Sequence, residues 1–126
     1  MDPTFTDREL DIMTVLWERR SGTAAEVRAV LPDQLAYNTV LTMLGVLREK
    51  GFVRREDDGR AYRYFPIVAR RKAKRSALRR LTARLFDGDP HLLVAELVSD
   101  RTLSDDDLRQ LKQLLDDRIE RRRTDR

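Results

Sequence analysis

The segment "AYNTVLTMLGVLREKGF", residues 36–52, decides how this chain is interpreted. It begins with polar residues, continues with Val40, Leu44 and Leu47 at helical spacing, and ends at Gly51, a residue that favours helix termination. The pattern predicts a helix over residues 36–50 with one face in a core. A helix that only filled a core would not need the polar cluster at its start, so that cluster is expected to contact something outside the fold.

Two further helices are predicted before this segment, and each has a side chain that can cap its start. Thr6 is followed three residues later by Glu9, which is the spacing of a capping box. Thr23 and Glu26 repeat that spacing, and Pro32 marks the end of the second helix. Apolar residues recur at helical intervals in both segments, so the three helices are expected to share a core.

The periodicity changes from helical to alternating after the third helix. The runs "FVRRED" and "AYRYFP" are rich in aromatic and β-branched residues, and Asp58-Gly59 between them is a tight-turn signal. These features predict a β-hairpin. It carries four arginines, which are Arg54, Arg55, Arg60 and Arg63.

Helical spacing returns after the hairpin. We expect helices over residues 69–87 and 91–98, and a last helix that begins at Ser104. Their apolar stripes lie in a region too slim to bury them within one chain, so we expect a second copy of the chain to cover them. The residues assigned to dimerisation are Leu81, Leu85, Leu93, Leu97, Leu108, Leu111, Leu115 and Ile119.

Three helices followed by an arginine-bearing hairpin is the element order of a winged helix-turn-helix. The expected fold is mainly α with a small β-hairpin wing: a winged helix-turn-helix domain over residues 1–68, which binds DNA, and a helical dimerisation region over residues 69–126. In such a fold the third helix lies in the major groove, where Asn pairs with adenine and Thr bonds to bases or phosphates. The predicted DNA contacts are Tyr37, Asn38, Thr39, Leu41, Thr42 and Arg48 on this helix, Thr23 and Ala24 at the start of the second helix, and the four hairpin arginines.

Several motifs resemble the penicillinase repressor family of bacterial transcription regulators. "TDRELDIMTVLW" is similar to the opening helix of that family, and "AYNTVLTMLGVLREKGFV" to its recognition segment. "GRAYRYFP" matches the wing pattern Gly-Arg-x-Tyr-x-Tyr-x-Pro throughout. The resemblance implies a homodimeric repressor that sits on a two-fold DNA operator and blocks transcription. The family commonly has a hydroxyl residue where this chain has Ala36, so one capping or phosphate contact is expected to be missing.

The resemblance also bears on how repression is relieved. Relatives that answer β-lactams are cut in the short C-terminal helix by a membrane-bound sensor protease, between an asparagine and a phenylalanine. The aligned pair in this chain is Glu96-Leu97, which is therefore the candidate cleavage site despite its different residues. Copper-responsive relatives use cysteines, and the lack of cysteine here excludes a thiolate copper switch.

Composition limits the other classes of function. The 126 residues include no cysteine, which excludes disulfides and thiol catalysis. No apolar run is long enough to span a membrane and the amino terminus is too charged for a signal peptide, so we expect a cytoplasmic protein without membrane insertion. His91 is the only histidine, and we find neither a glycine-rich phosphate loop nor a nucleophile–base pair. We therefore expect no enzyme, no cofactor and no metal site.

Other interpretations stay open at this point. A winged-helix module for protein contact would expose apolar residues such as Leu41 and Val46, and an RNA-binding protein would display aromatic residues on an open sheet. The segment over residues 69–84 contains eight basic residues and no acidic one. It is either a surface that attracts phosphates or a solvated helix face.

Overall fold

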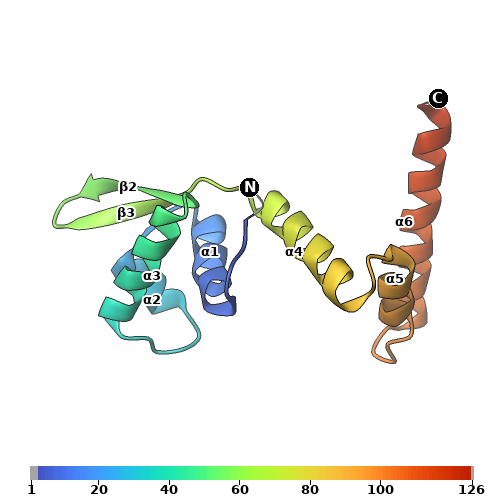
Figure 1. Cartoon of the computed structure of the whole chain (residues 1–126), viewed down its shortest axis with the longest axis horizontal. Coiled ribbons are helices and arrows are strands. Elements are labelled where there is room, and N and C mark those ends of the chain that lie inside the picture. The colour runs from blue at the N-terminus through green and yellow to red at the C-terminus, as the bar shows by residue number, and fades with distance from the viewer. Residues whose placement is uncertain (1–2, 126) are drawn as a thin grey trace. The chain divides into compact units, whose positions relative to one another are not determined.

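Within residues 3–125, which the computed structural model describes, the chain forms six helices and a three-stranded antiparallel sheet (Figure 1). The chain divides into two compact units, of which the first ends at Arg79 and the second begins at Arg80. The predicted fold class, mainly α with a small β wing, is confirmed.

Three helices make up most of the first unit: α1 (Asp7–Arg19), α2 (Ala24–Val30) and α3 (Tyr37–Glu49). The capping box at the start of α1 is present, because Glu9 N donates to Thr6 Oγ1 (3.1 Å) and Thr6 N donates to Glu9 Oε1 (2.8 Å). Ala36 precedes α3 and supplies no side-chain cap, as its methyl group predicts.

The sheet has one more strand than the sequence indicated. β2 (Val53–Asp58) and β3 (Ala61–Pro66) form the predicted hairpin around Gly59, whose φ of +68° suits glycine. β1 (Gly22–Thr23) pairs with the other edge of β3, which gives the strand order β1-β3-β2. A strand of two residues is too short to produce an alternating pattern, and for this reason it was missed.

The core of the first unit lies between its three helices and the base of the hairpin. Each helix contributes the stripe expected from its spacing, and the hairpin contributes one residue from each strand. The larger core residues are Ile12, Met13, Leu16, Val27, Val40, Leu44, Leu47, Val53 and Tyr64, none of which is more than 2% exposed.

The fourth helix, α4 (Arg70–Leu85), contains the division between the two units. Its first turns pack on the first unit: Ala73 is buried, and the buried Ser76 hydroxyl donates to the carbonyl of Pro3 (3.1 Å). Trp17 Nε1 donates to the carbonyl of Val68 just before the helix (2.9 Å). These contacts explain why the first unit extends beyond residue 68, where we placed the domain boundary.

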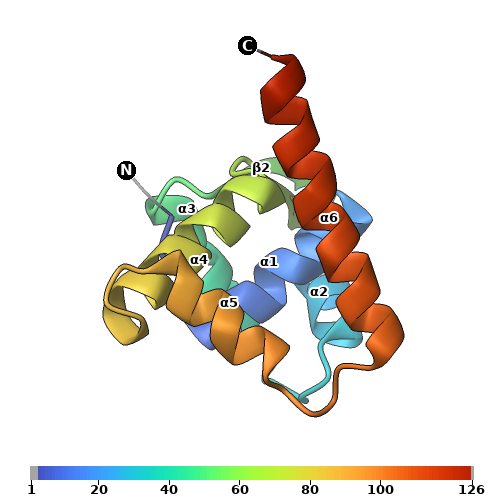
Figure 2. The ribbon, with the colours of Figure 1, turned by 90° about the vertical axis from the view of Figure 1, so that its right-hand side faces the viewer.

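The second unit contains the end of α4, α5 (Pro90–Val98) and α6 (Asp105–Thr124) (Figure 2). Asp89 caps α5 by accepting from His91 N (2.9 Å), and Ser104 forms a capping box with Asp107 at α6. α5 and α6 have no buried residue. Among the described residues, no helix is both long and apolar enough to cross a membrane.

Candidate nucleic-acid interface

The start of α3 presents a polar edge to solvent. Tyr37, Asn38, Thr39 and Thr42 are all exposed. Within residues 3–125, the side chains of Asn38, Thr39 and Thr42 have no hydrogen-bond partner. Their donors and acceptors are therefore available to a partner outside the chain, which is the property that base-edge contacts require.

The opposite side of α3 is fixed to the core. Val40, Leu44 and Leu47 are fully buried, which holds the helix in one orientation. Leu41, which we predicted among the DNA contacts, is half-buried and packs against this core, so only part of its side chain remains accessible. Arg48 in the last turn is exposed.

The end of α3 is tied to the start of α1 by an ion pair. Lys50 Nζ lies 3.0 and 2.9 Å from the two carboxylate oxygens of Glu9. Burial alone would raise the pKa of Glu9, but the hydrogen bonds from Thr6 N and Lys50 outweigh this effect and the net pKa is lowered. One carboxylate therefore serves both the α1 cap and the end of α3.

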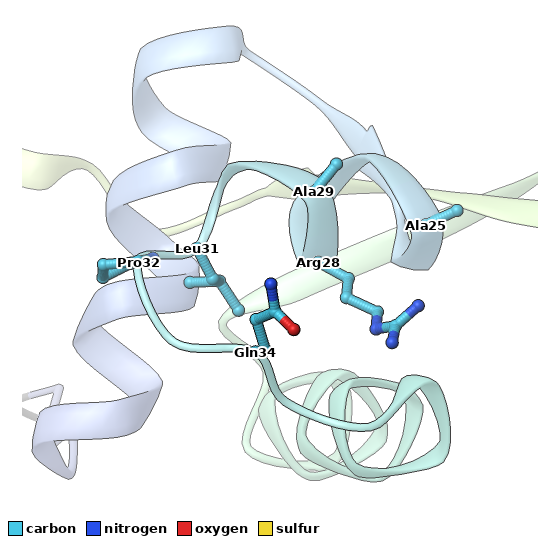
Figure 3. A pocket seen from close by; sticks show the side chains of 6 residues that line it. All are labelled: Ala25, Arg28, Ala29, Leu31, Pro32 and Gln34. Carbon is cyan, nitrogen blue, oxygen red and sulfur yellow. The ribbon is translucent and has the colours of Figure 1, made fainter.

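The turn between α2 and α3 is braced by Arg28. Its Nε donates to the carbonyl of Leu35 (2.7 Å), which lies just before α3. A shallow pocket lies between α2 and this turn, and Figure 3 shows the Arg28 and Gln34 side chains at its wall. The pocket is lined by Ala25, Arg28, Ala29, Leu31, Pro32 and Gln34. The brace fixes the chain that leads into the polar edge of α3.

Within the described chain, three of the four wing arginines have no hydrogen-bond or ion-pair partner outside the hairpin. Arg54 stacks over the ring of Phe65 at 4.2 Å and pairs with Glu56 at 2.6 Å. Arg55 stacks over the ring of Tyr62 at 3.9 Å. Arg60 lies at the exposed tip, and the described chain offers its side chain no ion pair or hydrogen bond.

Arg63, the fourth wing arginine, keeps 30% of its side chain exposed, but its guanidinium is engaged in hydrogen bonds within the protein. Its guanidinium donates to both carboxylate oxygens of Glu26, to the Ser21 hydroxyl and to Asp58 Oδ2. The hydrogen bonds from Arg63 to the Glu26 carboxylate are the main reason why the pKa of Glu26 is lowered. Arg63 therefore has fewer N–H donors left for an external phosphate than the other three wing arginines have.

The side chains at the start of α2 are also engaged within the protein. Thr23 Oγ1 accepts from Glu26 N (3.2 Å) and donates to Glu26 Oε2 (3.3 Å), so the hydroxyl already has both roles. Ala24 is only 2% exposed. The two residues predicted as phosphate contacts thus offer no free side chain, because capping and packing use them.

The comparison with known proteins assigns the chain to a family. Residues 5–117 match the penicillinase repressor family. The chain belongs to that family. Its family and fold are those of DNA-binding transcriptional repressors, and the resemblance seen in the sequence is confirmed.

Relatives of the penicillinase repressor family match over most of the chain. The penicillinase repressor of Bacillus licheniformis is 25% identical and covers 96% of both chains. The methicillin resistance regulatory protein MecI of Mammaliicoccus sciuri is 23% identical over 85% of this chain and 89% of its own. The solved DNA-binding domain of the repressor BlaI is 30% identical with a TM-score of 0.52, over 57% of this chain and 90% of that domain.

The second unit of this penicillinase repressor family member leaves apolar side chains uncovered. Of the eight residues predicted to form a dimer interface, six are exposed, from 38% for Leu108 to 72% for Leu85, and Leu93 and Leu111 are half-buried. A hollow between α5 and α6 is lined by Val94 and Leu115, among others. Glu96 and Leu97, the candidate cleavage pair, are both exposed near the end of α5.

Sequence reasoning missed three structural roles at this interface. Glu26 was assigned only to a capping box, Asp58 only to the turn of the hairpin, and Ser21 was given no role. The signal that could have indicated an ion pair is the position of Arg63 on β3, but it depends on β1, which the sequence did not reveal. Groups of three or more side chains able to hold a metal ion are absent from the described residues.

Proposed function

We propose that this protein is a homodimeric repressor that binds a two-fold DNA operator and reads its sequence with the start of α3. The observation that carries this proposal is the exposed, unpartnered edge formed by Asn38, Thr39 and Thr42 on a helix whose other side is fully buried. A rigid helix with free donors and acceptors at its first turns is what major-groove readout requires. Family membership supports the same proposal.

The wing supplies the sequence-independent part of binding. Arg54, Arg55 and Arg60 are available for phosphate oxygens or for the minor groove beside the site read by α3. Arg48 adds a cation at the end of α3. Neutralising phosphates releases condensed counterions, so the affinity is expected to fall steeply with salt concentration.

Dimerisation places two such surfaces on one DNA duplex. The exposed stripes of the second unit give a second copy an apolar surface to cover, and a C2 pair presents two α3 helices to two half-sites. Half-sites read by such pairs lie about one helical turn (~34 Å) apart. Binding by both subunits raises the overall affinity well above that of one subunit.

Relief by a sensor protease stays part of the proposal, with the Glu96-Leu97 bond as its target. Both side chains are accessible, but the bond lies within helix α5. A protease that takes extended substrates would need local unwinding of α5 before the cut. Loss of the segment from Leu97 onward would remove α6 with its four predicted interface residues, which would weaken the proposed dimer.

The test of sequence-specific binding is a mobility-shift assay with duplex genomic fragments and an excess of nonspecific competitor DNA. We expect selective retention of a small set of fragments. Asn38→Ala should then lower affinity for a retained fragment by about tenfold, because one good base contact contributes about 1–3 kcal/mol. Binding to competitor should not change. Gln110→Ala, an exposed site on α6, is the control and should bind as the parent does.

The same assay separates the repressor from its alternatives. Retention of single strands only would favour an RNA-binding or single-strand-binding protein. No retention at all would favour a protein-contact module, for which the 40% exposure of Val46 on α3 is the relevant feature. Either outcome would reject the proposed function.

A further inference from the structure

Four hydrogen bonds hold the guanidinium of Arg63 on β3. Nη2 donates to Glu26 Oε2 at 2.7 Å and Nη1 to Glu26 Oε1 at 3.2 Å. Nη1 also donates to Ser21 Oγ at 3.2 Å, and Nε donates to Asp58 Oδ2 at 3.0 Å. A guanidinium has five N–H donors, so these bonds leave one of them for any other partner.

The four bonds join parts of the first unit that are separate in the sequence. Ser21 lies in the link after α1, Glu26 in the first turn of α2, and Asp58 at the tip end of β2. Arg63 itself lies on the central strand, where it pairs with Thr23 of β1 and Glu56 of β2. The guanidinium therefore connects the projecting half of the wing to the start of α2.

Other wing arginines do not make such a connection. Arg54 pairs with Glu56 and stacks on Phe65, and all three residues belong to the hairpin. Arg55 stacks on Tyr62, also within the hairpin. Among the described residues, Arg63 is the wing arginine that has hydrogen-bond partners outside the hairpin, namely Ser21 and Glu26.

We propose that Arg63 is a positioning residue: with Glu26 and Asp58 it fixes the angle of the wing relative to α2 and α3, and it makes no phosphate contact itself. This inference rests on the proposed function and reassigns one of the predicted DNA contacts. A two-stranded hairpin that projects beyond its core is poorly ordered by its own bonds. Fixing it before binding removes the entropic cost of ordering it on DNA, which is how Arg63 would raise affinity.

The contrast between Arg63→Gln and Arg63→Lys tests this role. Lysine keeps the positive charge but has a single ammonium group, which cannot span Glu26, Ser21 and Asp58 in the guanidinium's geometry. If Arg63 positions the wing, both variants should lose affinity for a retained duplex by about two- to tenfold. The slope of log affinity against log salt should stay as in the parent, because no phosphate contact is removed.

Arg60→Gln is the matched control for the salt slope. Arg60 lies on the same wing without an internal partner, so its loss should flatten the slope by about 0.9. Amide ¹⁵N relaxation of the full-length protein supplies a readout that needs no DNA. Order parameters over residues 57–61 should fall from about 0.85 toward 0.6 in both Arg63 variants. Arg54→Gln, which breaks only bonds within the hairpin, should leave them near the parent value.

The opposite pattern overturns the inference. If Arg63→Gln flattens the salt slope as Arg60→Gln does, while Arg63→Lys binds like the parent, Arg63 is a phosphate contact. Unchanged order parameters in both Arg63 variants would also reject the positioning role. If the parent retains no duplex selectively, the proposed function fails, but the relaxation data still decide whether Arg63 holds the wing.

Discussion

The two units use the same apolar spacing with opposite results. Leu44 on α3 is fully buried within one chain, whereas Leu115 on α6 is 58% exposed. Both residues belong to stripes that recur every three or four positions. Helical spacing therefore tells which side of a helix is apolar, but it does not tell whether the same chain or another molecule covers that side.

The difference follows from the number of layers in each unit. In the first unit three helices and the base of a sheet surround one core, so every stripe meets another element. The second unit has only the end of α4, the short α5 and the long α6. Contiguous exposed apolar patches on proteins often mark interaction sites. The first unit is complete as a fold, and the second is expected to be completed by association.

The largest effect is expected from a charge placed in the open stripe. Leu115→Asp should dissociate the proposed dimer, because a carboxylate would have to be buried in its interface without a partner. Operator affinity should fall by about a hundredfold or more as binding by two linked subunits is lost. Size-exclusion chromatography with light scattering, together with the mobility-shift assay, measures both changes.

The control for that substitution is Gln110→Asp, which adds the same charge to an exposed position on another side of α6. It should remain dimeric and bind as the parent does. A parent protein that is monomeric at micromolar concentration would show that the stripes serve some other purpose, and the comparison between units would then need a different explanation.

The next effect concerns the free energy of unfolding, and it compares the closed core with an exposed leucine of α6 outside the predicted dimer interface. Leu44→Ala removes a fully buried side chain and should cost about 2–5 kcal/mol of unfolding free energy. Leu114→Ala, at a position that is 66% exposed, should cost less than about 0.5 kcal/mol. Chemical denaturation followed by circular dichroism measures both. Similar costs for the two variants would mean that Leu114 is also covered in solution.

The smallest expected effect is a dependence of the stability of the first unit on pH. The pKa of Glu26 is lowered by hydrogen bonds from Arg63, and the pKa of Glu9 is lowered despite its burial by Thr6 N and Lys50. Because both lie below the ordinary value of 4.5, the stabilisation they provide is complete above that pH. It is lost as the pH falls through the lowered values.

Thermal unfolding between pH 7 and pH 3 measures this loss. The midpoint should hold above about pH 5 and fall by a few degrees below about pH 4 as the two carboxylates are protonated. Glu26→Gln should lower the midpoint at neutral pH and reduce the fall in acid. A midpoint that is equally sensitive to acid in this variant would place the relevant carboxylate elsewhere.

Local signals in the sequence predicted the elements and the exposed edge of α3. Thr6 with Glu9 and Ser104 with its first turn marked helix starts, since capping depends on residues three positions apart. Gly59 marked the hairpin turn. The exposure of Asn38 and Thr42 followed from the spacing of the buried residues Val40, Leu44 and Leu47, because helix geometry places the two polar residues on another side.

The missed features depend on residues far apart in the chain. β1 exists only because β3 offers it an edge, and Arg63 meets Glu26 across 37 positions. Leu41 was assigned to the exposed side, but the core reaches far enough around α3 to cover part of it. The spacing of residues along one helix or strand does not predict contacts between residues so far apart in the sequence.

The dual use of Glu9 has a consequence for how the chain can vary. Glutamine normally substitutes for glutamate in a capping box with little penalty, since its side-chain oxygen accepts the same backbone hydrogen bond. Here an amide would keep the cap of α1 but would leave the ammonium of Lys50 without its counter-charge at the end of α3. A Glu9→Gln substitution would therefore preserve the start of α1 but weaken the attachment of the end of α3. That helix carries the exposed polar residues Asn38, Thr39 and Thr42 at its start.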